Sequence, residues 1–306
     1  MDAFIAEAAQ WGMDDRQLAA FVAVAEELSF TRAAARLYVV QSTLSATIRS
    51  LEQDLGAPLF TRSTRRVTLT VVGEALLPSA RAAIDSVDRM RSLAADDAAG
   101  LRGRVRVGTF SALDILDLPG ALGAFRRRHP LVDLLLRTSP SGSTGLAEDL
   151  RRGRLDVALL ALPVAELDDL AVTTVVRDRY LLLVESADPM ARLVRPSPAD
   201  LEGAAFIDTP VGFGNRVSVD RAFRAAGATR RVATEVADLP AIPLFVQAGL
   251  GPAVVPRSGI APLDGVTAID LDWPGLVWEV SVCSAMRPSA AVQALTALLA
   301  ERAEAV

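Results

Sequence analysis

The side chains best suited to chemistry in this chain are arginines, and they gather near the N-terminus. Residues 28–70 contain six arginines against two acidic residues, whereas the whole chain of 306 residues has a formal net charge of −5. A positive segment on an otherwise acidic protein attracts phosphate while the remainder repels it, so a nucleic acid would bind at this end only. The same charge also fits an ordinary solvated surface, and the order of the residues must decide between the two readings.

Residues 41–55 carry the side chains best placed to read DNA bases. Leu44, Ile48, Leu51 and Leu55 repeat at helical spacing, so a helix that buries this stripe exposes its opposite face. That face is small and hydrogen-bonding, and it comprises Ser42, Ala46, Arg49 and Gln53 with Ser45 and Ser50 on its flanks. Such a face fits closely into a major groove and offers donors to base edges, whereas a solvated helix would more often show Glu and Lys.

Two further helices must position that helix. Residues 18–28 repeat apolar side chains at helical spacing and predict an amphipathic scaffold helix, introduced by two aspartates at its positive end. A short helix over 32–37, capped by Ser29 or Thr31, follows it. Because so few residues separate this short helix from the one that begins at Gln41, the pair is predicted to form a helix-turn-helix.

Residues 59–70 predict two short strands joined by a turn. Three arginines lie at or beside this turn, namely Arg62, Arg65 and Arg66. Such a wing lies against the DNA backbone or enters the minor groove, where arginine is favoured. Residues 13–70 are therefore predicted to form a winged helix-turn-helix that binds DNA.

Short motifs run through the same residues in register and without a gap. They include Arg16-Gln17-Leu18, Phe21-Val22-Ala23-Val24-Ala25-Glu26, Ser29-Phe30-Thr31-Arg32-Ala33-Ala34, Leu44-Ser45, Leu51-Glu52, Leu55-Gly56 and Leu59-Phe60. Together they resemble the N-terminal domain of LysR-type transcriptional regulators. The resemblance implies promoter binding by a dimer or tetramer, with base contacts from the helix that begins at Gln41 and phosphate contacts from the preceding helix and the wing.

The candidate DNA-binding residues combine the exposed face, the wing and this resemblance. They are Thr31, Arg32, Gln41, Ser42, Thr43, Ser45, Arg49, Arg62, Arg65 and Arg66. Two positions depart from the family pattern, because Val40 stands where members usually carry Ser, and Ala46 stands where many carry a polar or basic side chain. Ala46 offers a thymine only its methyl group, so base readout would depend on Arg49, Gln41 and DNA shape.

Residues 71–100 predict a linker helix that pairs with a second copy. Small and apolar side chains alternate at spacings of four and three, at Leu76, Ala80, Ala83, Val87, Met90 and Ala94. This is a coiled-coil seam, although its alanines bury little surface, and the alternative is a helix packed on its own domain. In the resembled family the corresponding helix pairs with its mate, which implies a homodimer or a dimer of dimers.

Residues 103–306 alternate predicted strands and helices, which indicates a parallel α/β sheet in each of two lobes. Lobe I is expected at 103–178 and 267–306, and lobe II at 179–266, so that two crossovers would form a hinged cleft. The pieces that resemble the family's effector domain, which is similar to a periplasmic binding protein, are Gly108-Thr109, Phe125 with His129-Pro130, Gly153-Arg154-Leu155-Asp156-Val157-Ala158 and Ala248-Gly249-Leu250-Gly251. The predicted fold class is thus α/β, with a winged helix-turn-helix and a long linker helix before the two lobes.

Ligands of open α/β sheets bind beyond the carboxyl ends of the strands, often at helix N-termini. By this rule the candidate effector-binding residues are Thr109, Ser111, Thr138, Ser139, Ser143, Thr209, Phe213 and Asn215. Hydroxyls and amides around an apolar cleft suit a small molecule with few polar groups, such as a carboxylate. The alternative is that these Ser and Thr side chains cap helices.

Residues typical of catalysis or metal binding are scarce. Cys283 is the single cysteine and His129 the single histidine, so we expect neither a disulfide within the chain nor a metal site. The segment 141–145 does not match a nucleophile elbow, and 212–217 lacks the third glycine of a dinucleotide fingerprint. We expect no catalytic residue, no cofactor and no enzyme; the alternatives are an enzyme or a two-lobed small-molecule-binding adaptor without a role on DNA.

The N-terminal residues do not resemble a targeting segment. Residues 1–15 include acidic side chains and no basic one, which is the wrong charge for a signal peptide or a presequence. Residues 1–12 are either a mobile extension or precede the true start at Met13.

The uncharged run 239–256 contains four prolines and two glycines, which favours a buried loop, helix and strand over a membrane span. We expect a cytoplasmic protein with no membrane contact, whose partners are double-stranded promoter DNA, a second copy of itself, a small-molecule effector and, as a further candidate, RNA polymerase.

Overall fold

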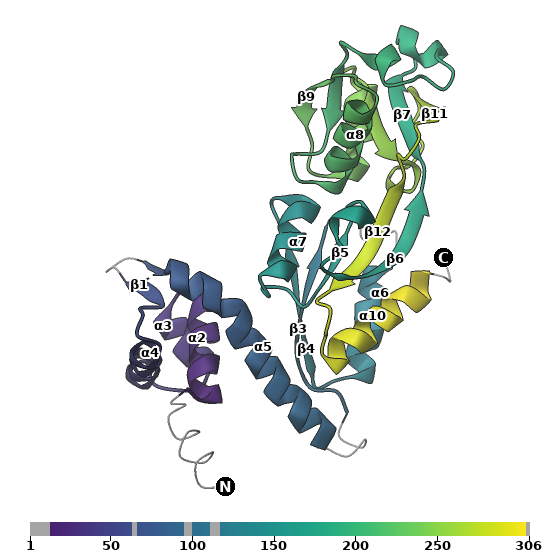
Figure 1. The fold of residues 1–306 in the computed structure, drawn as a ribbon. Helices are drawn as coiled ribbons and strands as arrows, with labels where there is room; N and C mark the ends of the chain where they lie inside the picture. The colour runs from purple at the N-terminus through teal and green to yellow at the C-terminus, as the bar shows by residue number, and fades with distance from the viewer. Residues whose placement is uncertain (1–12, 63–65, 95–99, 111–116, 304–306) are drawn as a thin grey trace. The chain divides into compact units, whose positions relative to one another are not determined.

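The computed structural model describes residues 13–62, 66–94, 100–110 and 117–303. The chain divides into two compact units, residues 1–99 and residues 100–306, each with its own hydrophobic core (Figure 1). The first unit is helical with a small two-stranded sheet, and the second mixes strands and helices. The predicted fold class is therefore confirmed, and the two units are described in turn.

The first unit contains the predicted winged helix-turn-helix. Its elements are α2 (Asp15–Glu27), α3 (Phe30–Arg36), α4 (Gln41–Leu55), β1 (Phe60–Arg62), β2 (Val67–Leu69) and α5 (Val71–Ala94). Strands β1 and β2 pair antiparallel and form the wing. The start of α2 is set by a capping box, in which the side chains of Asp14 and Gln17 each accept a hydrogen bond from the other residue's backbone N–H, at 2.7 and 2.8 Å.

The core of the first unit is formed by the apolar stripe of α4 and by aromatic contacts. Leu44, Ile48 and Leu51 are buried as the sequence predicts, whereas the last member of the stripe, Leu55, is 38% exposed because it ends the helix. The ring of Phe60 in the wing meets the rings of Phe21 and Phe30 edge to face, with centroids 5.6 and 5.9 Å apart. These contacts fix α4 and the wing on the scaffold helix α2.

The predicted coiled-coil seam lies on α5, and its first and last residues have different surroundings. Ala80 is buried and Leu76 half-buried against the core of the first unit, where α5 packs on α2. Met90, two heptads after Leu76, is 61% exposed. The start of the seam is therefore occupied inside the unit, while Val87 and Met90 lie beyond its core; the side chain of Ala94 lies outside the described residues.

Lobe I of the second unit is built on a five-stranded sheet. In sheet order its strands are β4 (Val132–Thr138), β3 (Gly103–Thr109), β5 (Val157–Leu160), β12 (Trp278–Ser284) and β6 (Ala171–Asp178). Strands β4, β3 and β5 are parallel, as expected, but β12 runs antiparallel to both of its neighbours. The helices of this lobe are α6 (Leu118–Arg128), α7 (Gly142–Arg151) and α10 (Ala290–Ala303), with the short helix η3 (Val164–Glu166).

Lobe II is built around strand β7. Strands β10 (Ala253–Pro256) and β11 (Val266–Asp270) flank β7 (Tyr180–Glu185) antiparallel, and β8 (Ala205–Asp208) pairs parallel with β9 (Arg231–Glu235). The expectation of a parallel sheet is therefore wrong for β7, β10 and β11. The helices of this lobe are α8 (Gly214–Ala225) and α9 (Ile242–Gln247), with the short helices η4 (Pro189–Arg192), η5 (Ala199–Leu201), η6 (Leu239–Ala241) and η7 (Arg257–Gly259).

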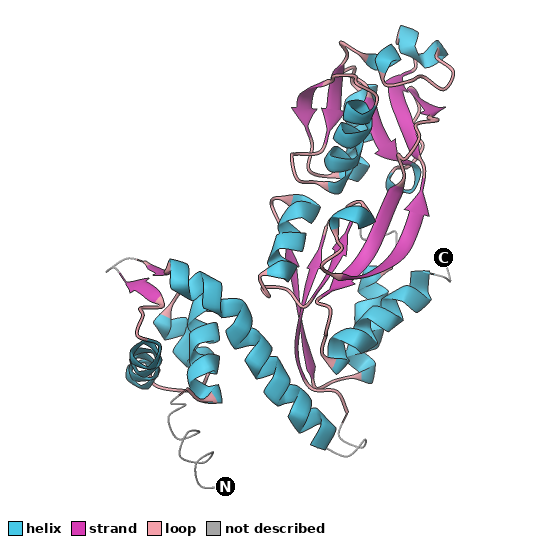
Figure 2. Cartoon of the chain, viewed as in Figure 1, coloured by secondary structure: helices cyan, strands magenta, loops and turns pink. Residues whose placement is uncertain are grey.

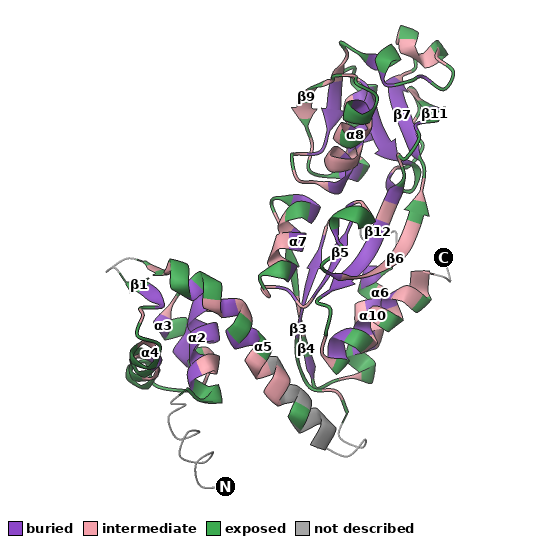
Figure 3. Cartoon of the chain, viewed as in Figure 1, coloured by how far each residue is buried: buried purple, intermediate pink, exposed green. Residues whose placement is uncertain are grey.

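The two crossovers between the lobes join β6 to β7 and β11 to β12 (Figure 2). Because β11 pairs with β7, lobe II extends at least to Asp270, and the boundary that the sequence predicts at 266/267 falls inside β11. Buried residues follow the central strands of both lobes (Figure 3). At the crossovers the ring of Trp278 meets those of Tyr180 and Phe110, with centroids 6.1 and 6.4 Å apart. Within the described residues, no helix combines the length and the apolar character that a membrane span requires.

We expect the substitution Leu51→Ala to destabilise the first unit by about 2–5 kcal/mol, because Leu51 is fully buried and its loss leaves a cavity. Leu55→Ala at the exposed end of the same helix is the matched control, with an expected effect under about 1 kcal/mol. Urea unfolding followed by circular dichroism measures helix loss, and the fluorescence of Trp273 and Trp278, with Trp11 replaced by Phe, follows the second unit. Equal effects of the two substitutions would contradict the described packing of α4.

Candidate nucleic-acid interface and effector cleft

The turn between α3 and α4 brings the first predicted DNA-binding residues together. The Thr31 hydroxyl donates a hydrogen bond to Oε1 of Gln41 at 3.0 Å, so the N-termini of the two helices are joined by exposed side chains. Ser29, and not Thr31, caps α3, because its Oγ accepts from the N–H of Arg32 at 3.3 Å. Thr31 is thus left to orient Gln41 at the start of α4.

The first turn of α4 has the exposed polar surface that the sequence predicts. Gln41, Ser42 and Thr43 are exposed, Ser45 is half-buried, and Arg49 is exposed one turn further along. Val40 occupies the N-cap position and provides no side-chain hydrogen bond to the first turn of the helix. The departure of this residue from the family pattern therefore leaves the positive end of α4 without a side-chain cap.

The arginines of α3 are tied to the end of α2. Arg32 pairs with Glu27, with Nε 3.3 Å from Oε2, and also donates to the Glu27 carbonyl. Arg36 pairs with Glu26 at 2.7 Å. The side chain of Arg32 remains 66% exposed, so its contact with Glu27 orients the guanidinium without removing it from solvent.

Glu26 and Glu52 hold the elements of the DNA-binding unit together, and neither role is predicted from the sequence. Glu26 is buried and also accepts from Arg81 of α5 at 3.1 Å, so one carboxylate joins α2, α3 and α5. Glu52 accepts from the backbone N–H groups of Leu59 and Phe60 at 2.9 and 3.3 Å and holds the wing on α4. Both residues lie inside the quoted motifs, and nothing in their spacing indicates these partners.

The wing arginines do not all have the same surroundings. Arg62 lies over the ring of Phe30, with its Cζ 4.4 Å from the centroid, and pairs with Glu52 at 3.3 Å. Arg62 therefore supports the wing as well as facing solvent. Arg66 is exposed, and Arg65 lies outside the described residues.

The predicted effector-binding residues of lobe I lie at one edge of its sheet. Thr109 and Thr138 are register partners at the carboxyl ends of β3 and β4. Ser139 and Ser143 follow at the start of α7, but both hydroxyls have local partners. The Ser143 Oγ accepts from the N–H of Ala161 at 3.1 Å, so it joins α7 to the end of β5 and does not cap a helix. Ser111 lies outside the described residues.

The predicted residues of lobe II converge on a buried carboxylate. Oδ1 of Asp208 accepts from the N–H of Thr209 at 2.6 Å and from Nδ2 of Asn215 at 2.7 Å. Arg230 pairs with Oδ2 of Asp208 at 2.5 Å and with Asp220 at 2.7 Å. Oδ1 of Asn215 is buried and has no hydrogen-bond partner within the described part of the chain. Asp208 and Arg230 thus fix the loop before α8, and neither residue is predicted from the sequence.

The two groups of predicted residues meet where α7 and α8 begin. A Cβ on Gly142, whose φ is +56°, would lie 2.7 Å from the ring of Phe213, so only glycine permits this approach. The N–H of Thr144 in lobe I donates to the carbonyl of Gly212 in lobe II at 3.0 Å. The structure therefore brings Ser139 and Ser143 near Phe213 and Asn215, across the boundary between the lobes.

The single cysteine is remote from this chemistry. Cys283 is buried in β12, and burial raises the pKa of its thiol to about 12. Burial, with a smaller contribution from Arg128, lowers the pKa of His129, which packs against the ring of Phe125. The described residues include no group of three or more His, Cys, Asp or Glu side chains suited to hold a metal ion.

A winged helix-turn-helix with an exposed polar helix, followed by a two-lobed α/β unit, defines a DNA-binding regulator with an effector domain. Comparison with protein families assigns both parts. Residues 16–74 match the model described as bacterial regulatory helix-turn-helix protein, lysR family, and residues 98–304 match the LysR substrate binding domain. The chain therefore belongs to the LysR family of transcriptional regulators.

Individual relatives agree with this assignment. The chain is 34% identical over 244 residues to a probable hydrogen peroxide-inducible genes activator of Mycobacterium avium, which covers 79% of this chain and 78% of the relative. It is also 34% identical over 253 residues to the Hca operon transcriptional activator HcaR of Escherichia coli, covering 80% and 82%. These relatives are transcriptional regulators, so the expectation that the protein is not an enzyme is confirmed.

Solved structures show the same fold. Full-length OxyR from Pseudomonas aeruginosa has a TM-score of 0.77 at 24% identity, with 95% of each chain covered. Full-length BenM has a TM-score of 0.54 at 26% identity, with 94% of this chain and 96% of that chain covered. The two family models and the relatives show that the protein is a DNA-binding transcriptional regulator with a helix-turn-helix head and an effector-binding domain.

We expect Cys283 to be unreactive in the folded protein at neutral pH. A thiol whose pKa is near 12 has roughly a thousandfold less thiolate than one at the ordinary value, and the thiolate is the nucleophile. Iodoacetamide labelling followed by mass spectrometry should therefore be slow for the native protein and fast after unfolding in urea. Rapid labelling or oxidation by hydrogen peroxide in the native state would contradict the burial of β12.

Proposed function

We propose that the protein reads operator DNA with the first two turns of α4 and contacts phosphates with α3 and the wing. The observation that carries this proposal is the exposed, hydrogen-bonding surface made by the Thr31–Gln41 pair, Ser42, Thr43 and Arg49. Arg49 forms no ion pair with another described residue, so its guanidinium is available to a guanine edge. Small side chains at Ser42, Ser45 and Ala46 permit close approach to the groove.

We further propose that two copies pair through the outer part of α5. Val87 and Met90 lie beyond the core of the first unit, and they continue the predicted seam. A dimer would present two heads to two half-sites, one helical turn of DNA or a multiple of it apart. The same proposal places the protein in the cytoplasm, where promoter DNA lies, and includes RNA polymerase as a candidate partner.

The effector is proposed to bind in the cleft at the carboxyl ends of β3, β4 and β8. The Thr109–Thr138 edge, Ser139 and the loop around Phe213 would surround it, and no cofactor besides the effector is proposed. Several hydroxyls here are engaged in local hydrogen bonds, which favours an effector with few polar groups, such as a small carboxylate. An effector that prefers one angle between the lobes shifts DNA binding by no more than its difference in affinity for the two states.

We expect Arg49→Ala to weaken binding to the specific operator by about 1–3 kcal/mol while leaving binding to random DNA nearly unchanged, because base contacts carry the sequence information. Arg66→Ala should instead weaken both and flatten the salt dependence by up to about one unit of slope. Arg126→Ala on α6 is the control. Footprinting on the DNA that flanks the protein's own gene supplies the operator, and fluorescence anisotropy measures affinity. An equal loss of affinity for the operator and for random DNA in Arg49→Ala would show that Arg49 contacts a phosphate and not a base.

We expect Thr109→Val and Ser139→Ala to weaken effector binding roughly tenfold or more, because each removes a hydroxyl at the proposed cleft. Thermal shift against a panel of small carboxylates identifies the effector with the parent protein, and titration then compares the variants. Ser197→Ala, in an exposed turn of lobe II, is the control and should respond as the parent does. A parent-like response of both cleft variants would show that the effector binds elsewhere.

A further inference from the structure

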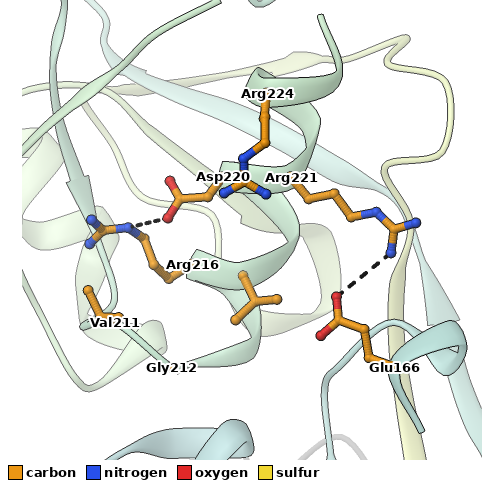
Figure 4. A pocket seen from close by; sticks show the side chains of 8 residues that line it. Glu166, Val211, Gly212, Arg216, Asp220, Arg221 and Arg224 are labelled. Atoms are coloured by element: carbon orange, nitrogen blue, oxygen red, sulfur yellow. Dashed lines mark hydrogen bonds and ion pairs between the residues drawn. The ribbon is translucent and has the colours of Figure 1, made fainter. Parts of the chain in front are cut away.

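A small cavity lies beside α8 at the junction of the two lobes (Figure 4). Its volume is about 190 Å³, which is below the roughly 300–1,000 Å³ of pockets that take drug-sized ligands. Lobe II contributes Val211 and three arginines of α8, and lobe I contributes Glu166. None of the described candidate effector residues lines it, although Val211 and Gly212 belong to the loop that precedes Phe213, so the cavity adjoins the proposed effector cleft.

The three arginines of this cavity differ in how far their charge is already neutralised. Arg216 pairs with Asp220 at 2.8 Å and with Glu235 at 3.1 Å, so its charge is matched. Arg221 meets a carboxylate only at 3.9 Å, on Glu166, and Arg224 forms no ion pair with any other described residue. Arg221 therefore has only a distant carboxylate partner, and the second carboxylate that lines the cavity, Asp220, is already paired with Arg216 and Arg230.

Glu166 is held firmly in lobe I, whereas Arg221 belongs to lobe II. The Glu166 carbonyl accepts from Nη2 of Arg151 at 2.9 Å, and Arg151 also pairs with Asp169 at 2.8 Å. Leu167, directly after Glu166, is buried and anchors the same segment. The contact between the side chains of Glu166 and Arg221 is thus an ion pair that crosses from one lobe to the other.

We propose that this cavity binds a small oxyanion, a carboxylate or a phosphate, between Arg221 and Arg224. The two arginines are three residues apart on α8, so their side chains leave the same face of the helix. A guanidinium group presents parallel N–H donors that match two oxygens of a carboxylate or phosphate, and such charge-assisted bonds are stronger than a pair stretched to 3.9 Å. Val211 and Val217 form an apolar wall that accepts a short carbon chain.

The anion replaces Glu166 as the partner of Arg221, and this gives the site a regulatory consequence. Release of Glu166 removes one ion pair that joins the lobes, so an anion at α8 changes the balance between lobe arrangements without entering the effector cleft. The protein would then respond to two ligands, and each would alter the apparent affinity for the other by the same factor.

Isothermal titration calorimetry of the full-length protein tests the site, with inorganic phosphate and succinate as probes at constant ionic strength. We expect saturable binding of at least one probe with a dissociation constant below about 10 mM. Arg221→Gln and Arg224→Gln should each weaken it at least tenfold, while Arg126→Gln, an exposed arginine of α6, should leave it unchanged. The stronger probe tells whether the natural ligand carries carboxylate or phosphate.

Glu166→Gln provides a readout that a merely structural role would not give. Because Glu166 competes with the anion for Arg221, its replacement should tighten anion binding severalfold. Arg221→Lys keeps the positive charge but loses the paired N–H donors of the guanidinium group, so it should bind the anion with intermediate affinity. Intermediate affinity would also show that the loss in Arg221→Gln is not caused by a folding defect. Absence of saturable binding, equal loss in Arg126→Gln, or weaker binding in Glu166→Gln would overturn the proposal, whatever the outcome at the effector cleft.

Discussion

The carboxylate of Glu26 is the interaction on which the DNA-binding unit depends, because guanidinium groups from two other helices converge on it. Arg36 of α3 and Arg81 of α5 both pair with this buried side chain. A buried carboxylate that lost one such partner would be left partly uncompensated, at a cost of about 3–5 kcal/mol for a typical buried pair. The helix-turn-helix and the linker helix are therefore held in one arrangement by charge as well as by apolar packing.

The second unit also contains a buried carboxylate with several partners. Asp208 accepts hydrogen bonds from Thr209, in the loop before α8, and from Asn215 at the start of α8, and it pairs with Arg230 just before β9. Every basic residue of the chain is arginine, and the planar guanidinium group satisfies several acceptors at once. Buried carboxylates that accept from several donors thus hold the elements of both units in place.

The contacts that shape the helix-turn-helix differ from those that join the two lobes. Local contacts such as Thr31 with Gln41 and Arg62 with Phe30 shape the head, and they involve no residue of the lobes. The lobes in turn meet through α7, α8 and the Glu166–Arg221 pair. The only cysteine of the sequence, Cys283, is buried in the central strand β12, where burial raises the pKa of its thiol.

The sequence by itself determined the elements whose signal is local. The stripe of Leu44, Ile48 and Leu51, the aspartates before α2 and the arginine-bearing wing are read from periodicity and turn chemistry within a few residues, and the structure has them where they are expected. The edge at which Thr109 and Thr138 lie also follows from strand order alone, since parallel strands end on the same side.

Only the tertiary structure decided which partner each polar side chain has. Ser143 meets Ala161, and Asn215 meets Asp208 and Val254, through contacts that no spacing rule specifies. The reversed direction of β12 and the placement of β11 in lobe II have the same origin. Apolar periodicity tells which face of an element is buried, but pairing between distant segments depends on which donors and acceptors the packed backbone brings within hydrogen-bonding distance.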